Sequence, residues 1–192
     1  VLCVAFINPA TIPAMGEHNV LNALAGFGAG VAAGIKPEQC ALALGNFKNT
    51  GMRQKVQICR GVTVVEDCYN ANPDSMKAAM NTLGAQKLPE GAQKIAVLGD
   101  MLELGTVAES SHYEIGKLVA EKADLLFCYG ELSRYIAAGA WRNGMEKAFH
   151  FETKEELSKF LRKTAKTGDM VWLKASRGMR FEDIAEAFYE ET

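Results

Sequence analysis

Residues 67–76 have the sequence DCYNANPDSM, in which an acid, a phenol and two amides fall within the first six positions. The segment follows an apolar run at residues 62–65, which is typical of a buried strand, and it precedes apolar side chains at helical spacing in residues 76–83. The polar side chains are therefore predicted to lie in a strand-to-helix loop. Loops at the carboxyl ends of strands are where α/β folds collect ligand-binding groups.

Part of this loop is explained by the start of a helix. Asn72 is a favourable N-cap residue, and Pro73 is a favourable first helical residue. A turn alone does not require Asp67, Tyr69 or Asn70, so we interpret these three side chains as candidates for ligand binding. An aspartate at a strand end can accept hydrogen bonds from both hydroxyls of a ribose, although it can also serve a turn.

The chain beyond residue 60 alternates between apolar runs and amphipathic segments. This alternation predicts a mainly parallel sheet with helices on both faces. For the first 60 residues the sequence predicts an opening strand and two helices, one from about Asn19 and one from Pro37 to Leu44, which cannot bury a core alone. We therefore expect them to be the end of another domain. The predicted strands cover residues 62–65, 95–98, 125–129, 148–151 and 170–173.

The composition excludes several classes of protein. The 21 basic and 23 acidic residues leave a formal net charge of -2, so there is no electrostatic basis for binding nucleic acid. Residues 154–166 are rich in charge, but their apolar residues recur at helical spacing, which indicates a solvated helix. No apolar stretch is long enough to span a membrane. The five scattered cysteines, without a C-x-x-C pair, favour reduced thiols in the cytoplasm over disulfides or a zinc site.

Three other patterns suggest chemistry but have a more ordinary explanation. Residues 28–33 match the G-x-G-x-x-A fingerprint of dinucleotide-dependent oxidoreductases, yet they fall inside a predicted helix rather than between a strand and a helix. Asp100, Glu103 and His112 are metal-ligating residue types, but His112 suits the first turn of a helix and we expect no metal site here. Cys68 has no neighbouring histidine in the sequence, so we do not interpret it as a nucleophile.

The segment 67–76 resembles the D-x-Y-N-A-N-P-x-S-M signature of one branch of the Mur ligases, which synthesise peptidoglycan. Four more segments are similar to motifs of the same family and occur in the same order. They are GEHNVLN at residues 16–22, MRQ at 52–54, GDMLELG at 99–105 and KASRGM at 174–179. The resemblance extends over the chain from Gly16 onward.

The resemblance implies an ATP-dependent ligase with Mg²⁺ as a further cofactor. Its implied reaction joins UDP-N-acetylmuramoyl tripeptide to D-alanyl-D-alanine through an acyl phosphate, and serves cell wall biogenesis, cell shape and cell division. By the same resemblance we expect a cytoplasmic monomer without a nucleic-acid or membrane partner. A non-catalytic α/β module that binds a nucleotide or a dipeptide without turnover is the alternative.

The resemblance also implies that the chain is a C-terminal fragment of a three-domain ligase. The phosphate-binding motif G-x-x-x-x-G-K-[ST] does not occur in this sequence. Residues 1–60 would be the remnant of the central ATP-binding domain, and residues 61–192 would form the Rossmann-like C-terminal domain. The metal ligands are then expected in the missing segment, the chain offers no candidate catalytic residue, and the isolated chain is expected to be inactive.

The nucleotide-binding candidates follow from the same resemblance. The side-chain amides of Asn19 and Asn22 share a helix face and can read the edge of adenine, although Asn19 could equally be an N-cap. The charged fork of Arg53 suits phosphate or ribose contacts. The full set of candidates is His18, Asn19, Asn22, Arg53 and Asp67.

The dipeptide-binding candidates all follow predicted strands. Because the carboxyl ends of parallel strands meet at one edge of a sheet, we expect these residues to gather there. Asp100 could steer the amine of the dipeptide, and Lys174 or Arg177 could neutralise its carboxylate. The full set of candidates is Tyr69, Asn70, Asn72, Asp100, Lys174, Ser176 and Arg177.

Overall fold

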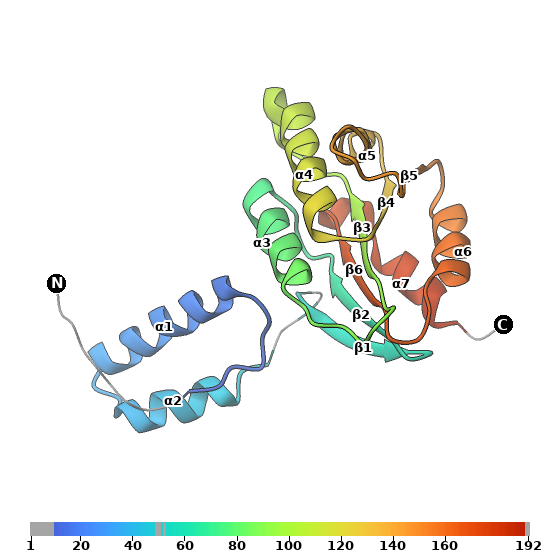
Figure 1. Cartoon of the computed structure of the whole chain (residues 1–192). Coiled ribbons are helices and arrows are strands. Elements are labelled where there is room, and N and C mark those ends of the chain that lie inside the picture. The colour runs from blue at the N-terminus through green and yellow to red at the C-terminus, as the bar shows by residue number, and fades with distance from the viewer. Residues whose placement is uncertain (1–9, 49–50, 52, 191–192) are drawn as a thin grey trace. The chain divides into compact units, whose positions relative to one another are not determined.

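The computed structural model describes residues 10–48, 51 and 53–190 of the 192-residue chain. The chain divides into two compact units, Val1–Thr50 and Gly51–Thr192. The first unit is helical, and the second combines a sheet with helices (Figure 1). Met52, from one of the family-like motifs, and the strand expected at the start of the chain lie outside the described residues.

Two helices form the described part of the first unit, α1 (Glu17–Ala32) and α2 (Pro37–Gly45). Helix α1 has Gly16 as its N-cap, so the alternative interpretation of Asn19 as the N-cap is wrong. A Cβ atom on Gly30 would lie 2.8 Å from the Sγ of Cys40, which shows how closely the two helices pack there. Residues 28–32 of the dinucleotide-like fingerprint thus lie on a helix, as the sequence predicted, and close packing at a small residue is seen at Gly30.

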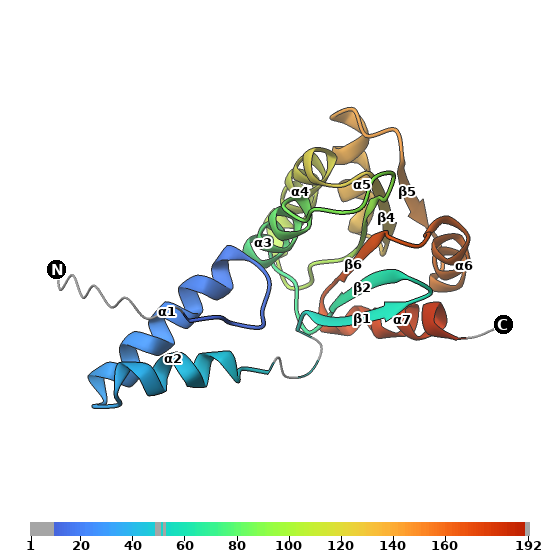
Figure 2. The ribbon, with the colours of Figure 1, turned by 60° about the horizontal axis from the view of Figure 1, so that its bottom comes forward.

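The second unit contains one six-stranded sheet with the strand order β1-β2-β6-β3-β4-β5 (Figures 1 and 2). Strand β1 runs antiparallel to β2, and the other neighbouring strands are parallel. The predicted mainly parallel sheet is therefore confirmed. The strands are β1 (Lys55–Cys59), β2 (Val62–Asp67), β3 (Lys94–Gly99), β4 (Leu125–Tyr129), β5 (Ala148–Phe151) and β6 (Met170–Lys174).

Helices cover both faces of this sheet, as predicted (Figure 2). The chain passes from β2 to β5 in one direction across the sheet, and it turns back to reach β6. Because crossovers between parallel strands are right-handed, this reversal moves the next helix to the opposite face. Helices α3, α4 and α5 pack in sequence on one face, and α6 packs against α7 on the other. The helices are α3 (Pro73–Gly84), α4 (Ala108–Lys122), α5 (Ser133–Arg142), α6 (Lys154–Thr164) and α7 (Glu182–Tyr189).

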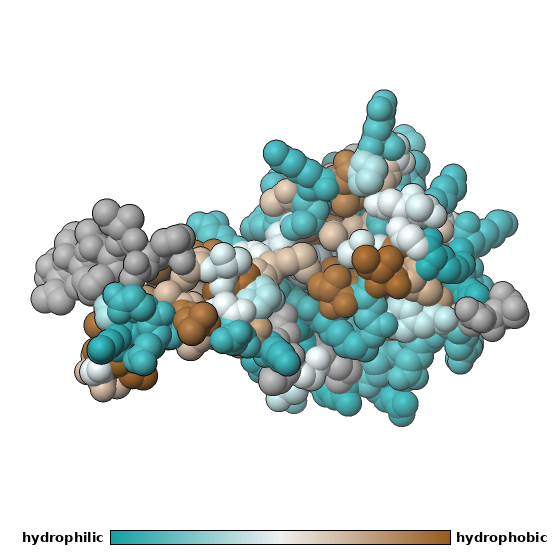
Figure 3. Space-filling model, turned by 90° about the horizontal axis from the view of Figure 1, so that it is seen from below, coloured by the Kyte–Doolittle hydropathy of each residue, from teal (hydrophilic) through white to brown (hydrophobic). Residues whose placement is uncertain are grey.

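Strand β1 was not predicted from the sequence. It is joined to β2 by a two-residue turn in which Arg60 and Gly61 both have positive φ angles, 52° and 72°, as a tight hairpin of this type requires. The sheet therefore begins at Lys55, before the expected domain start at residue 61. Val56 and Ile58 on this edge strand are 50% and 77% exposed. The surface seen from below likewise carries scattered hydrophobic side chains among hydrophilic ones (Figure 3).

Apolar side chains fill the space between the sheet and its helices. Helices α4 and α5 approach until their backbones touch: a Cβ on Gly116 would lie 2.1 Å from the Ile136 carbonyl oxygen, and one on Gly139 would lie 2.3 Å from that of Tyr113. Within the described part of the chain, no helix has the length and hydropathy needed to cross a bilayer. On the face covered by α6 and α7, the buried cluster includes Val64, Val97, Phe127, Leu157, Leu161, Val171, Phe181, Ile184 and Phe188.

Candidate functional site

The carboxyl ends of β2, β6 and β3 lie side by side in the sheet, where Lys174 pairs in register with Asp67 on one side and Leu98 on the other. The helices that follow β2 and β3 cover one face of the sheet, and α7 after β6 lies on the opposite face. The connections therefore diverge at this point, which is where open α/β sheets bind their ligands. The loop 67–76, singled out from the sequence, starts here.

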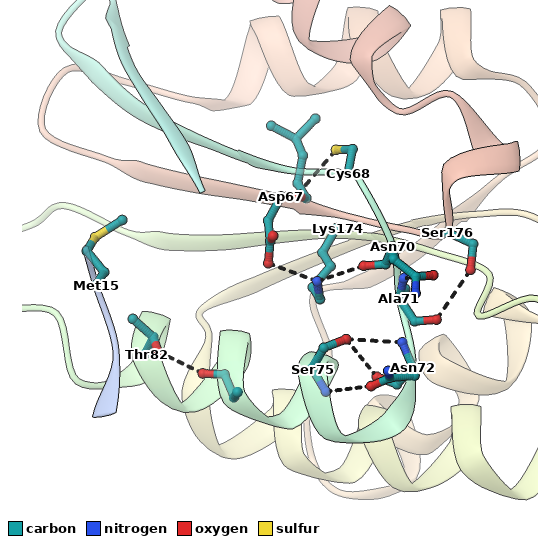
Figure 4. A network of polar contacts seen from close by, with 12 residues as sticks. Met15, Asp67, Cys68, Asn70, Ala71, Asn72, Ser75, Thr82, Lys174 and Ser176 are labelled. Atoms are coloured by element: carbon teal, nitrogen blue, oxygen red, sulfur yellow. Dashed lines mark hydrogen bonds and ion pairs between the residues drawn. The ribbon is translucent and has the colours of Figure 1, made fainter. Parts of the chain in front are cut away.

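A buried ion pair links the ends of β2 and β6. The Nζ of Lys174 lies 2.8 Å from the Oδ2 of Asp67 and donates a second hydrogen bond, 3.0 Å long, to the backbone carbonyl of Asn70 (Figure 4). The side chain of Lys174 is 3% exposed and that of Asp67 is 14% exposed. The ammonium thus binds two acceptors on the same loop, and solvent has little access to it.

Ser176 joins the loops that follow β2, β3 and β6. Its Oγ accepts a hydrogen bond of 2.9 Å from the backbone N–H of Leu102 and donates one of 3.4 Å to the carbonyl of Ala71. Its own backbone N–H donates to the carbonyl of Asp100 at 3.0 Å. Because Ser176 is only 5% exposed, these contacts hold the three loops together from within (Figure 4).

Asn72 begins helix α3, as predicted. Its Oδ1 accepts a hydrogen bond from the backbone N–H of Ser75 at 2.8 Å, and the Oγ of Ser75 accepts one from the N–H of Asn72 at 3.1 Å, which completes a reciprocal cap. In the same loop, the Oδ1 of Asn70 accepts from the N–H of Ala71 at 2.8 Å. The amide nitrogens of both asparagines are the groups that a ligand could use.

Asp100 lies at the end of β3 and supports the start of helix α5. Its Oδ1 accepts a hydrogen bond of 2.7 Å from the backbone N–H of Ser133, and the residue is 5% exposed. A Cβ atom on Gly130 would lie 2.3 Å from this oxygen, so glycine is required for the close approach. A carboxylate at a helix N-terminus is stabilised by the helix dipole. This position competes with the predicted role of Asp100 in steering an amine.

His112 is a structural residue of the same region. Its Nε2 accepts a hydrogen bond of 2.9 Å from the backbone N–H of Met101, and its Nδ1 donates one of 2.7 Å to the carbonyl of Ala108. The fully buried ring therefore holds the loop after β3 against helix α4. Among the residues that the structure describes, no three His, Cys, Asp or Glu side chains are grouped to hold a metal ion.

Tyr69 and Arg177 carry exposed side chains, as do the candidates Asn70 and Asn72. The ring of Tyr69 is 48% exposed, and the guanidinium of Arg53 lies over it at 4.5 Å from the ring centroid. The side chain of Arg177 is 56% exposed and forms an ion pair of 2.7 Å with Glu182. Arg53, a candidate for nucleotide binding, thus contacts Tyr69, a candidate for dipeptide binding, within the second unit.

The three remaining nucleotide candidates lie on α1, in the first unit. His18 and Asn19 fall in its first turn, and Asn22 follows one turn later on the exposed surface. The Nδ2 of Asn19 donates a hydrogen bond of 2.7 Å to the carbonyl of Met15, which fixes the residues that lead into the helix. The predicted adenine contacts of Asn19 and Asn22 remain predictions.

Cys68 is unsuited to nucleophilic catalysis. Its Sγ is buried and donates a weak hydrogen bond to the carbonyl of Leu173 at 3.5 Å. Burial, followed by the nearby carboxylates of Asp67 and Glu66, raises the pKa of this thiol to about 12. Because the thiolate is the reactive form, the group is inert near neutral pH.

Residues 52–177 match the family described as the glutamate ligase domain of Mur ligases. The chain belongs to the Mur ligase family. It is 40% identical over 186 residues to the UDP-N-acetylmuramoyl-tripeptide–D-alanyl-D-alanine ligase of Bacillus subtilis, covering 95% of this chain and 40% of that protein. The ligase of the same name from Escherichia coli is 28% identical over 183 residues, covering 93% of this chain and 38% of that protein.

Solved structures of Mur ligases have the same fold as this chain. MurF from Acinetobacter baumannii superposes with a TM-score of 0.82 at 29% identity, over 95% of this chain and 39% of that one. MurF from Thermotoga maritima, solved in complex with ADP, gives a TM-score of 0.77 at 26% identity, over 91% of this chain and 38% of that one. The chain thus spans about two fifths of the length of the relatives it matches.

Two buried or partly buried acids of this Mur ligase chain, Glu66 and Glu182, were not predicted from the sequence. Glu66 on β2 accepts a hydrogen bond of 2.8 Å from the hydroxyl of Tyr189 on α7 and pairs with Lys55 on β1 at 3.2 Å. Burial, followed by this contact with Glu66, raises the pKa of the Tyr189 phenol. Glu182 holds Arg177. Tyr189 is 123 positions from Glu66 in the sequence and Lys55 lies on an unpredicted strand, so no local motif could have revealed these two contacts. Arg177 and Glu182, by contrast, are only five positions apart.

Proposed function

We propose that this chain forms the C-terminal part of an ATP-dependent ligase that adds D-alanyl-D-alanine to UDP-N-acetylmuramoyl tripeptide in peptidoglycan synthesis. The observation that carries the proposal is the position of the loop 67–76, whose family signature lies where the connections of the sheet diverge and is tied to Lys174 and Ser176. The ligases named above support the proposal, because they match more than nine tenths of the chain.

The proposed reaction has two steps. A carboxylate oxygen of the tripeptide attacks the γ-phosphorus of ATP, so that ADP leaves and an acyl phosphate forms. The amine of the dipeptide then attacks the acyl carbon, loses a proton and displaces phosphate, which leaves the new amide bond. ATP supplies the activating phosphoryl group, and Mg²⁺, when bound, would neutralise negative charge on the phosphates. We assign the metal ligands and the phosphate-binding groups to another part of the ligase.

In this scheme, Asp67 and Arg53 bind the nucleotide. The Oδ2 of Asp67 is held by Lys174, so Oδ1 is the oxygen available to accept from ribose hydroxyls. The guanidinium of Arg53 rests on the ring of Tyr69, which orients an otherwise mobile side chain toward a phosphate or ribose. Roles in nucleotide binding for His18, Asn19 and Asn22 stay predictions.

The dipeptide presents an ammonium, one amide and a carboxylate, and the carboxyl edge of the sheet offers complementary groups. Arg177 is the exposed cation that suits the carboxylate. The exposed phenol of Tyr69 and the amide nitrogen of Asn70 can bind the peptide group. Contacts from Asn72, Asp100 and Ser176 stay predictions, as do the cytoplasmic location and the monomeric state.

A phosphate-release assay tests this function. The full-length protein that contains this chain is expected to release phosphate only when ATP, UDP-N-acetylmuramoyl tripeptide and D-alanyl-D-alanine are all present. The 192-residue chain alone is expected to give no turnover, because the groups that hold the β- and γ-phosphates are assigned elsewhere. Turnover by the chain alone would refute that assignment. Binding of ADP or dipeptide by the full-length protein without any turnover would favour the non-catalytic binding module instead.

A further inference from the structure

Lys174 occupies an unusual place for a charged residue. It ends β6, all five residues of which are buried, and this strand lies in the sheet between β2 and β3. A buried ammonium is costly unless it is paired and hydrogen-bonded. Among the described residues, the contacts that compensate it come from one loop, through the carboxylate of Asp67 at 2.8 Å and the carbonyl of Asn70 at 3.0 Å. The charge of Lys174 and the conformation of residues 67–70 are therefore coupled.

We propose that Lys174 is a positioning residue for Asp67 and does not itself bind the dipeptide. The ammonium draws Oδ2 of Asp67 toward the sheet, and this leaves Oδ1 directed for a ligand. The inference rests on the proposed function, because it assumes that Asp67 binds the nucleotide. It differs from the prediction made from the sequence, in which Lys174 neutralises the carboxylate of the dipeptide.

Burial separates these two roles of Lys174. A carboxylate ligand would have to reach an ammonium whose side chain is 3% exposed, and it would compete there with Asp67 for the same charge. An ammonium has three N–H donors, of which two already point to acceptors on the loop. The side chain of Arg177, three residues later, pairs with Glu182 but is 56% exposed, so a ligand can reach this cation. The geometry therefore favours Arg177 for the dipeptide and Lys174 for holding Asp67.

A double-mutant cycle on the full-length ligase tests the proposal, with the Kd for ADP as the main readout. Lys174→Met keeps the length of the side chain and removes its charge, and Asp67→Asn removes the partner charge. Each single variant is expected to weaken ADP binding by about ten- to a hundredfold, the loss typical of a charge-assisted hydrogen bond. The double variant is expected to bind ADP no more weakly than Asp67→Asn alone, because Lys174 acts through Asp67.

Lys94→Met is the matched control. Lys94 begins β3 at the opposite edge of the sheet, is partly buried and also donates to a backbone carbonyl, that of Gly84. The Lys94→Met variant can be less stable than the wild type, but its Kd for ADP is expected to stay within about twofold of the wild-type value. Lys174→Arg, which retains the charge, is expected to recover part of the ADP affinity lost in Lys174→Met.

Several results would overturn the proposal. Lys174→Met with normal ADP binding and a raised KM for the dipeptide would make Lys174 a direct ligand. A double variant that binds ADP about tenfold more weakly than Asp67→Asn would show independent roles. If Lys174→Met does not fold, the comparison of the double variant with Asp67→Asn still decides, because the double variant leaves no unpaired buried charge. Failure of the proposed function is separate: the wild-type protein itself would then lack ADP binding and turnover.

Discussion

The contact between α4 and α5 and the carboxyl edge of the sheet are held together in different ways. At the first, Gly116 and Gly139 allow the two helix backbones to touch. At the second, Lys174 and Ser176 reach across from β6 and its loop to neighbouring loops through hydrogen bonds and an ion pair. The first region depends on the absence of a Cβ atom at two glycines, and the second depends on which polar groups are present. We therefore expect substitutions in the first to reduce stability, and substitutions in the second to reduce ligand affinity.

The largest effect is expected for Gly116→Ala. The new Cβ atom would lie 2.1 Å from the carbonyl oxygen of Ile136 and 2.8 Å from the nitrogen of Ala140, so backbone must move to admit it. Overpacking of this kind typically costs about 1–3 kcal/mol, and a clash with backbone places the variant at or above the upper end. Urea denaturation monitored by circular dichroism would measure the decrease in the free energy of unfolding.

Gly26→Ala is the control for this prediction. It adds the same atom to helix α1 at a position where nothing lies within 4 Å, and it is expected to leave stability unchanged or to raise it by about 1 kcal/mol through helix propensity. Equal unfolding midpoints for Gly116→Ala and the wild type would contradict the backbone contact between α4 and α5.

The sequence predicted the strands that are buried on both faces, since their apolar runs are short and regularly spaced. It also predicted the edge strand β5, where Phe149 is 37% exposed, but not the edge strand β1, where Val56 and Ile58 are exposed. Position at the edge of the sheet therefore does not by itself explain why β1 was missed. The contact of α4 with α5 could not be predicted either. A glycine within a helical pattern does not reveal whether it meets another backbone or solvent, and Gly26 and Gly116 illustrate the two outcomes.

The candidate site was predicted unevenly for a related reason. Residue types and spacing indicated the loop 67–76, since a polar cluster between a strand and a helix has few structural explanations. The partners of its residues could not be predicted from local patterns, because Asp67 and Lys174 are 107 positions apart in the sequence. Asp100 shows the same limit: the strand end was predicted, but not the N–H of Ser133 that occupies its carboxylate. Local patterns indicate where polar groups lie in the chain, whereas the arrangement of the strands in the sheet determines which of these groups already have hydrogen-bond partners.

Arg177→Ala tests the carboxyl edge in the full-length ligase and has the next largest expected effect. Loss of a charge-assisted bond to the dipeptide carboxylate costs about 1.5–3 kcal/mol, so the KM for D-alanyl-D-alanine should rise roughly ten- to a hundredfold. The KM for ATP should change little. Steady-state assays with one substrate varied at a time would measure both constants.

Arg180→Gln is the control for Arg177. Arg180 lies three residues further on, is 70% exposed and also pairs with an acid, Asp183. Its loss is expected to leave both KM values unchanged. If Arg177→Ala raised both KM values equally, Arg177 would act on the shape of the whole edge, for example through its ion pair with Glu182. An unchanged KM for the dipeptide would show that Arg177 is a solvated surface residue without a role in binding.

The smallest effect is expected at Asn72, where a helix cap and a predicted substrate contact coincide. Asn72→Ala removes the acceptor for the N–H of Ser75 and should lower the free energy of unfolding by about 1 kcal/mol. Asn72→Asp keeps this acceptor and adds a negative charge at the helix N-terminus, so stability should be restored. The two variants separate the roles, because aspartate caps the helix but lacks the amide nitrogen. If Asn72→Asp is stable and the dipeptide KM is normal in the full-length ligase, Asn72 serves the helix alone. A raised KM in this stable variant would show that the amide nitrogen also binds the dipeptide.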